Sequence, residues 1–340
     1  MSERNTAGVR KIEVKQDDDG QRLDRWVKKN LPEIPYTLIQ KLLRKGQMRV
    51  DGKRAKPDTR LIAGQEIRIP PVKERPRLEA GKLDDKDKAF IKSLVIYEDA
   101  DVIALNKPAG LATQGGSKTG YHIDGLLDAL KNKDGVRPRL VHRLDKDTSG
   151  VLLLARSAQI ARNLGEAFKK REVKKIYWAV CSPAPEAADG AIKAPLAKAG
   201  GSNKERMSVD EKDGKSAITD FVVLEKALDS AAFVAFWPRT GRTHQIRVHA
   251  EAIGCPIVGD KKYARLPEQE ETHEARRKAE ADLKPLNLSG RLHLHARRVM
   301  MPHPGRKGML DITAPLPPEL VKSWKALGFS TNLKQDPFEV

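Results

Sequence analysis

A stretch without apolar periodicity divides this sequence and most constrains its fold. Residues 70–92 are rich in Pro, Lys, Glu and Asp, and their apolar residues recur at neither helical nor strand spacing. Such composition is typical of a linker between domains. We therefore expect a small domain over residues 11–75, a linker over 76–92 and a larger domain over 93–330 of the 340-residue chain.

The first domain carries helix signals followed by short strand signals. Apolar residues recur at helical spacing in two groups, Leu23, Trp26, Val27 and Leu31, and then Leu38, Ile39, Leu42 and Leu43. Gly46 stands where the second helix would end in a left-handed cap. Alternation around Met48 and the run 64–69 predict a small hairpin after that helix.

Positive charge is concentrated in this first part of the chain. The whole sequence has a formal net charge of +18, and residues 1–75 hold 19 Lys and Arg against 11 Asp and Glu. Six of these basic residues crowd the second helix and the turn after it: Lys41, Arg44, Lys45, Arg49, Lys53 and Arg54. They are candidate phosphate contacts to nucleic acid. The alternatives are a solvated helix face or a charge that serves only solubility.

The same segment resembles the RNA-binding domain named after ribosomal small-subunit protein S-four, also called the alpha-L motif. The resemblance rests on Arg22-Leu23-Asp24, on the helix ending at Gly46, and on Val50-Asp51-Gly52-Lys53. The sequence departs from the commoner pattern at Tyr36-Thr37, where that domain often has Ser-Arg.

The second domain shows strands and helices in an irregular order. Strand patterns occur at 94–97, 102–105, 151–155, 176–181, 219–224 and 232–237, and helical patterns at 158–170 and 268–284. A regular strand–helix alternation, which would indicate a doubly wound fold, is missing. The order predicts an α+β domain with a mixed, largely antiparallel sheet.

Several function classes find no support in the sequence. Cys181 and Cys255 are its only cysteines, so neither a disulfide framework nor a CxxC zinc pair is available. No phosphate-cradling GxxxxGK motif occurs, and no apolar run approaches the length of a membrane span. We expect a cytoplasmic monomer without metal, nucleotide cofactor or membrane contact.

The most informative segment, Leu140–Ala155, runs from a dense polar turn directly into an apolar strand. Such a turn can hold a carboxylate at the mouth of a sheet. Taken alone, Asp145 and Asp147 are more typical of turn formers or strand caps than of catalysts. His142 alone likewise indicates a hydrogen-bonded structural histidine.

Three segments in order resemble the central motifs of the RNA pseudouridine synthases of the RluA class. They are His142-Arg143-Leu144-Asp145 with Asp147-Thr148-Ser149-Gly150, then Lys174–Ala179, and then Thr240–His249. Weaker matches lie at Leu105–Gly110 and Leu292–Ala296. The resemblance implies an enzyme that isomerises uridine in large-subunit ribosomal RNA, with no cofactor, because no electrons or external groups are transferred.

The resemblance also assigns roles to four residues. Asp145 would be the nucleophile, forming an adduct with either the sugar or the uracil ring. Tyr177 would stack near the target base, and Arg247 would pair with Asp145 and favour its ionised form. Arg143 would fill the place of the flipped-out base. The alternatives are a strand aromatic for Tyr177, a surface pair with Glu251 for Arg247, and a phosphate contact or a pair with Asp147 for Arg143.

Two other functions stay open at this point. The first is a pseudouridine synthase acting on transfer RNA, and the second is a non-catalytic RNA-binding protein of ribosome assembly. Because Asp145, Tyr177 and Arg247 occur together, the sequence favours an enzyme over the second.

Overall fold

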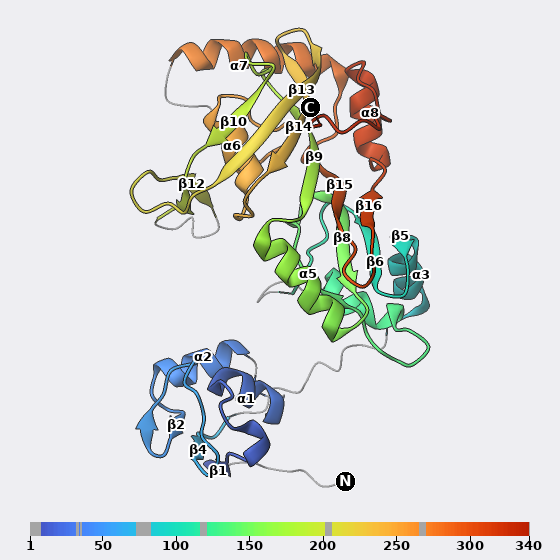
Figure 1. The fold of residues 1–340 in the computed structure, drawn as a ribbon. Coiled ribbons are helices and arrows are strands. Elements are labelled where there is room, and N and C mark those ends of the chain that lie inside the picture. The colour runs from blue at the N-terminus through green and yellow to red at the C-terminus, as the bar shows by residue number, and fades with distance from the viewer. Residues whose placement is uncertain are drawn as a thin grey trace. The chain divides into compact units, whose positions relative to one another are not determined.

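The computed structural model describes residues 8–31, 34, 36–72, 83–115, 121–200, 206–264 and 270–339. The chain divides into two units, Met1–Lys82 and Leu83–Val340 (Figure 1). Within the described residues, no helix combines the length and apolar character needed to cross a membrane.

The first unit packs two helices on a small antiparallel sheet. Its helices are α1 (Leu23–Asn30) and α2 (Tyr36–Arg44), with a 3₁₀ turn at Gln16–Asp18. Its strands are β1 (Arg10–Glu13), β2 (Arg49–Val50), β3 (Lys53–Arg54) and β4 (Glu66–Ile69), in the order β1-β4-β2-β3. The apolar faces of both helices close a core that includes Trp26, Ile39 and Ile67. Strand β1 was not predicted, because Ile12 is its only apolar residue.

The end of α2 follows the predicted cap. Gly46 has φ +66°, and the backbone N–H groups of Gly46 and Gln47 donate to the carbonyls of Leu43 and Leu42 at 2.9 Å each. The Arg54 side chain lies against the Cα of Gly46, where a Cβ would stand. The cap therefore brings the basic β2–β3 hairpin against the carbonyl end of the helix.

The second unit is built on one large sheet whose path is β10-β13-β14-β9-β15-β8-β6-β5, with β16 beside β15 and β7 beside β8. The strands are β5 (Val95–Glu98), β6 (Val102–Lys107), β7 (Arg139–Leu140), β8 (Ser149–Ala155), β9 (Lys174–Cys181), β10 (Asp189–Lys193), β13 (Ile218–Ala227), β14 (Ala231–Pro238), β15 (Leu294–Pro302) and β16 (Met309–Thr313). Every pairing is antiparallel except β15 with β8. The predicted α+β fold with a mixed, largely antiparallel sheet is confirmed.

Helices cover both faces of this sheet (Figure 1). They are α3 (Asp85–Ser93), α4 (Ile123–Leu126), α5 (Ala158–Lys170), α6 (Gln245–Ala252), α7 (Glu270–Leu283) and α8 (Pro318–Ala326), with 3₁₀ turns at Leu127–Leu130 and Lys284–Leu286. Along β9, Trp178 packs with Trp324 of α8, whereas Ala179 packs with Ile246 of α6. Since neighbouring strand residues face opposite ways, α6 and α8 lie on opposite faces. A separate hairpin joins β11 (Leu196–Lys198) to β12 (Met207–Val209).

The structure corrects the expected linker and the expected end of the second domain. Residues 85–92 of the predicted linker belong to α3, which the Asp84 side chain caps by accepting from the Asp87 N–H. Ile91 of this helix is fully buried with Leu105. Charged residues surround Ile91 and the partly buried Phe90 in this helix, so the sequence showed no apolar periodicity there. Beyond residue 330, Asp336 is buried and bonds Lys174, so the unit continues almost to the end of the chain.

Gly150 sits where β8 meets β15, the contact that joins the two halves of the large sheet. It pairs with Ala296, has φ +112°, and leaves no room for a Cβ beside the Ala296 carbonyl.

We predict that Gly150→Ala lowers the free energy of unfolding by more than about 2 kcal/mol, because the steric clash and the backbone strain both destabilise the folded state. Gly165→Ala in α5 is the control. Nothing lies within 4 Å of its Cβ position, so helix propensity should stabilise it by up to about 1 kcal/mol. Denaturant unfolding of both variants checks this, and equal stabilities would contradict it.

Candidate active site

Asp145 lies in the loop between β7 and β8, and the backbone on both sides of it is fixed. On one side, Thr113 Oγ1 donates to the Leu144 carbonyl at 2.8 Å and accepts from the Leu144 N–H at 3.2 Å. On the other side, the Lys146 carbonyl accepts from the Gly110 N–H at 2.9 Å and from Lys107 Nζ at 3.1 Å. The Asp145 side chain itself is about one-third exposed. The loop therefore presents a carboxylate to solvent from a rigid backbone.

Lys107 supports this loop from inside the protein. Its side chain is fully buried, and Nζ also donates to the carbonyls of Pro108 and Leu111 at 2.8 Å each. Burial lowers the pKa of Lys107 to about 7, although the charges of Asp147 and Asp145 act to raise it. All three of its donors are directed at backbone carbonyls, so Lys107 has a structural part in shaping the loop.

His142 is structural, as its sequence context alone indicated. Its Nε2 accepts from the Leu153 N–H at 2.9 Å, and its ring packs against Phe168 with centroids 4.9 Å apart. Burial lowers the pKa of His142 to about 3, so the ring is neutral. It anchors the start of the Asp145 loop to β8.

Arg247 reaches Asp145 from α6, but its tight partner is a different residue. Its Nη1 lies 4.0 Å from Asp145 Oδ2, while Nε and Nη2 donate to the two carboxylate oxygens of Asp260 at 2.6 and 2.7 Å. Burial alone would lower the pKa of Arg247, and the Asp260 bonds raise it above its ordinary value. The alternative pair with Glu251 is wrong, because Glu251 bonds Arg206 at 3.1 Å. Sequence reasoning missed Asp260, since no spacing rule links it to Arg247.

Sequence reasoning did not single out His244, which approaches Asp145, or Tyr263, which contacts His244. His244, at the start of α6, has φ +55°, and its Nε2 lies 3.8 Å from Asp145 Oδ2. Its Nδ1 lies 2.7 Å from Oη of Tyr263, which is fully buried. Burial lowers the pKa of His244. His244 could have been predicted as a site residue, because it belongs to the segment Thr240–His249 on which the resemblance rests.

Tyr177 lies on β9, on the sheet face that α6 covers. It packs at the edge of the cores that contain Ile246 and Leu144. Burial, and then the charge of Asp145, raise the pKa of Tyr177 well above its ordinary value. The hydroxyl therefore keeps its proton at neutral pH and is a donor rather than a base. It makes no hydrogen bond to any residue that the structure describes.

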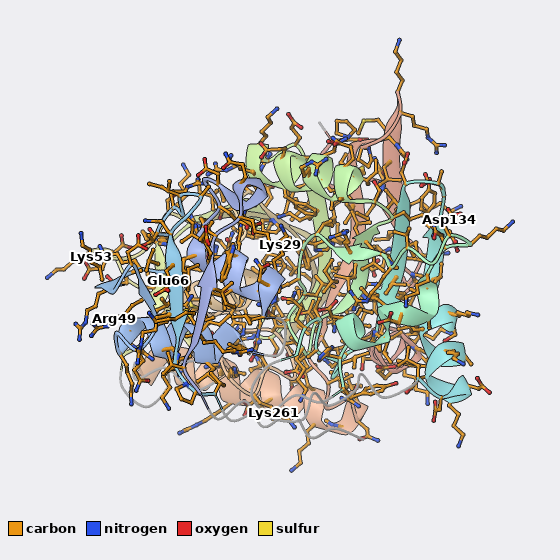
Figure 2. All side chains as sticks on the ribbon, turned by 90° about the horizontal axis from the view of Figure 1, so that it is seen from below. Lys29, Arg49, Lys53, Glu66, Asp134 and Lys261 are labelled. Carbon is orange, nitrogen blue, oxygen red and sulfur yellow. The ribbon has the colours of Figure 1, made fainter. Side chains whose placement is uncertain are left out.

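Arg143 is exposed two residues before Asp145. Among the described parts of the chain it has no hydrogen bond or ion pair, so the alternative pair with Asp147 is absent. Six basic residues of the first unit, the candidate phosphate contacts, are also exposed and form no ion pair with a described acidic residue: Lys41, Arg44, Lys45, Arg49, Lys53 and Arg54. Arg49 donates to the carbonyls of Gly46 and Gly52 at 3.1 Å each. Figure 2 shows Arg49 and Lys53 pointing away from the sheet.

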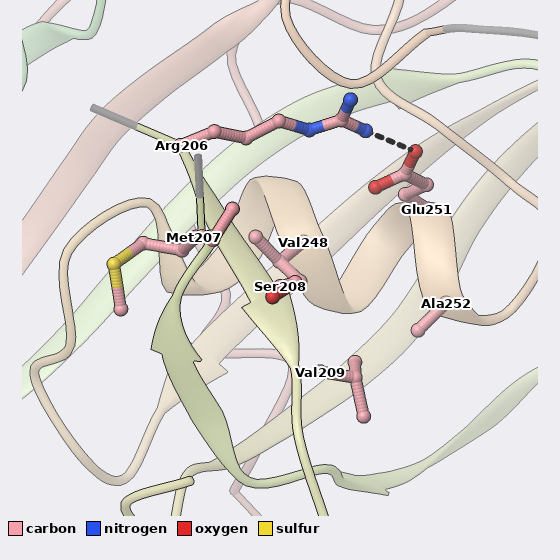
Figure 3. A pocket seen from close by; sticks show the side chains of 9 residues that line it. Arg206, Met207, Ser208, Val209, Val248, Glu251 and Ala252 are labelled. Atoms are coloured by element: carbon pink, nitrogen blue, oxygen red, sulfur yellow. Dashed lines mark hydrogen bonds and ion pairs between the residues drawn. The ribbon is translucent and has the colours of Figure 1, made fainter. Parts of the chain in front are cut away.

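A cavity of about 400 Å³ borders the other end of α6 (Figure 3). Val248, Glu251 and Ala252 line it together with β12, and neither Asp145 nor Tyr177 does. In the regions with described coordinates, no cluster of three or more His, Cys, Asp or Glu could hold a metal ion. The reactive groups thus gather at Asp145 and not at this cavity.

The buried pair between Arg247 and Asp260 gives a direct stability test. The Arg247 side chain is 5% exposed and the Asp260 side chain is fully buried. We predict that Asp260→Asn lowers the free energy of unfolding by about 3–5 kcal/mol, because it leaves a buried cation without its counter-charge. Asp145→Asn, at a side chain about one-third exposed, is the control and should change stability by less than about 1 kcal/mol. Urea unfolding measures both, and similar losses would contradict the assignment of Asp260 as the anchor.

Comparisons with known proteins agree on one family. Residues 101–252 match the model described as RNA pseudouridylate synthase. Ribosomal large subunit pseudouridine synthase C of Rickettsia bellii is 40% identical over 248 residues, 71% of this chain and 82% of that protein. Its Escherichia coli counterpart is 35% identical over 92% of this chain and 94% of its own.

A solved structure adds the fold. Human RNA Pseudouridylate Synthase Domain Containing 4 superposes with a TM-score of 0.58 at 28% identity, over 72% of this chain and 97% of that one. The match to the family model includes Asp145, Tyr177 and Arg247. The chain therefore belongs to the RNA pseudouridylate synthase family.

Proposed function

We propose that this protein isomerises specific uridines of large-subunit ribosomal RNA to pseudouridine, with Asp145 as its nucleophile. Arg247 and His244 both approach Oδ2 of Asp145, and hydrogen bonds of the neighbouring Leu144 and Lys146 carbonyls fix the backbone that bears it. This arrangement is the main support for the proposal. The relatives named for the ribosomal large subunit favour this substrate over transfer RNA. The protein acts as a cytoplasmic monomer in this proposal.

Asp145 suits the reaction because a carboxylate can form and later release a covalent adduct. The bond between ribose and uracil nitrogen breaks, the base turns, and the bond re-forms to carbon, with the adduct on the sugar or on the ring. That carbon loses its proton and the freed nitrogen gains one, so the product is an isomer of the substrate. Arg247 places a positive charge 4.0 Å from Asp145 Oδ2, and Asp260 fixes the direction of the guanidinium. No electrons or external groups are transferred, so the proposal includes no cofactor and no metal.

Tyr177 contacts the flipped uracil in this proposal, and Arg143 contacts the RNA that the base has left. Tyr177 offers its ring as a stacking surface, and its hydroxyl, which stays protonated, can donate to a uracil carbonyl. Arg143 takes the place of the flipped base in the RNA, since its planar guanidinium can stack and donate hydrogen bonds together. Its exposure and lack of a described protein partner leave it available for this contact.

The first unit captures RNA. The six candidate phosphate contacts on α2 and the following hairpin lack described acidic partners, so their charge remains available to phosphates. The order of helices and hairpin supports an alpha-L type of RNA-binding domain. Arg49 is pre-positioned by its two carbonyl bonds, which reduces the entropy lost when a phosphate binds.

Asp145→Asn tests the catalytic assignment. We predict that this variant folds and binds a large-subunit ribosomal RNA transcript as tightly as the parent protein but has no turnover, because an amide keeps the shape and loses the nucleophile. Pseudouridine is counted by nuclease digestion and chromatography, and affinity by filter binding. Multiple turnover by the variant would remove Asp145 from this role. A parent protein that converts no uridine in any ribosomal or transfer RNA would favour the non-catalytic alternative.

The basic residues of the first unit are tested by salt dependence. We predict that combining Lys41→Gln, Arg44→Gln and Lys53→Gln lowers the slope of log affinity against log salt by about two to three, since each phosphate contact contributes about 0.7–0.9. Turnover at saturating RNA should change little. The control carries the same charge loss on the α8 side of the catalytic unit, as Lys322→Gln, Lys325→Gln and Lys334→Gln, all exposed positions. Equal slopes for the two variants would show that the first unit does not bind phosphates.

A further inference from the structure

His244 connects Asp145 to a buried tyrosine. One ring nitrogen, Nε2, lies 3.8 Å from Asp145 Oδ2, and the other, Nδ1, lies 2.7 Å from Tyr263 Oη. The His244 side chain is 10% exposed and Tyr263 is fully buried, so water has little access to the tyrosine contact. The hydrogen bond between Tyr263 Oη and His244 Nδ1 can therefore determine which ring nitrogen of His244 carries the proton.

The hydrogen bonds of Tyr263 determine the histidine tautomer. Its Oη accepts from the Met207 N–H at 2.9 Å. The hydroxyl proton then needs an acceptor, and His244 Nδ1 is the one acceptor found for it in the described structure. Nδ1 is therefore unprotonated, and a neutral imidazole must carry its hydrogen on Nε2, which faces Asp145.

Tyr263 is itself held firmly. Its ring makes two cationic contacts, with its centroid 5.0 Å from the Arg247 guanidinium carbon and 5.2 Å from that of Arg206. Its backbone N–H donates to Asp260 Oδ1, the carboxylate that also orients Arg247. One buried carboxylate thus fixes both donors that approach Asp145.

We propose that His244 is a positioning residue whose Nε2–H, set by Tyr263, holds Oδ2 of Asp145 beside Arg247. The other carboxylate oxygen, Oδ1, is then free to face the uridine. The inference rests on the proposed role of Asp145 as nucleophile. Both donors stand slightly beyond hydrogen-bond distance, at 3.8 and 4.0 Å, and such contacts tighten when substrate closes the site. His244 keeps a left-handed backbone, φ +55°, which aims the ring at the loop.

A matched pair of variants tests the donor. His244→Gln keeps an N–H near the position of Nε2, whereas His244→Met has a similar shape and no donor. We predict that His244→Met lowers kcat by about tenfold to a hundredfold, the loss expected for a hydrogen bond to a charged group, with KM for RNA nearly unchanged. His244→Gln should recover most of that loss. Equal rates for the two variants, whether both reduced or both normal, would overturn the proposal.

The tautomer can be read in the parent protein without any variant. In protein with ¹⁵N-labelled histidine, the His244 signal, identified by its contact with the Tyr263 ring, should report hydrogen on Nε2 and none on Nδ1 at neutral pH. Hydrogen on Nδ1 would overturn the proposal even if the variants fail to fold. Tyr263→Phe should shift the ring toward a mixture of tautomers. Because this readout needs no turnover, its failure is distinguishable from failure of the proposed function.

Discussion

The ion pair between Arg247 and Asp260 is the interaction on which the rest of the site depends. Both side chains are buried, and the pair uses Nε and Nη2, which leaves Nη1 as the nitrogen nearest Asp145. Buried pairs of this kind contribute little net stability, since desolvation offsets most of the Coulomb attraction. This pair instead sets orientation. Because the guanidinium is planar, the two hydrogen bonds to Asp260 fix the direction in which Nη1 points toward Asp145.

The sheet brings the remaining groups to the same place. β9, β15 and β8 are neighbours, so Tyr177 on β9 and the loop that enters β8 come together although 32 positions separate Tyr177 from Asp145. The contact between β8 and β15 is short and parallel, and it requires Gly150. The motif Asp147–Gly150 therefore has two structural functions. Its first residues turn the chain after Asp145, and its glycine lets the two halves of the sheet meet.

Sequence reasoning succeeded where local pattern determines structure. The apolar runs of β8 and β14, the periodic helix α5 and the Gly46 cap were predictable because each depends on near neighbours. Helix α3 was missed because a single buried residue, Ile91, anchors a charged segment. Within the site, the resemblance named Asp145, Tyr177 and Arg247; Arg247 does lie 4.0 Å from Asp145, and the catalytic roles of all three stay predictions. Asp260 and Tyr263 could not be found, because their roles come from long-range hydrogen bonds that no spacing encodes.

We propose that this chain isomerises uridines of large-subunit ribosomal RNA with Asp145 as the nucleophile. The most direct measurement maps pseudouridine across ribosomal and transfer RNA in cells whose only copy of the gene encodes Asp145→Asn, beside cells with the unaltered gene. Specific pseudouridines should disappear from large-subunit ribosomal RNA in the variant strain, and transfer RNA should be unchanged. A large-subunit map identical in the two strains would contradict it.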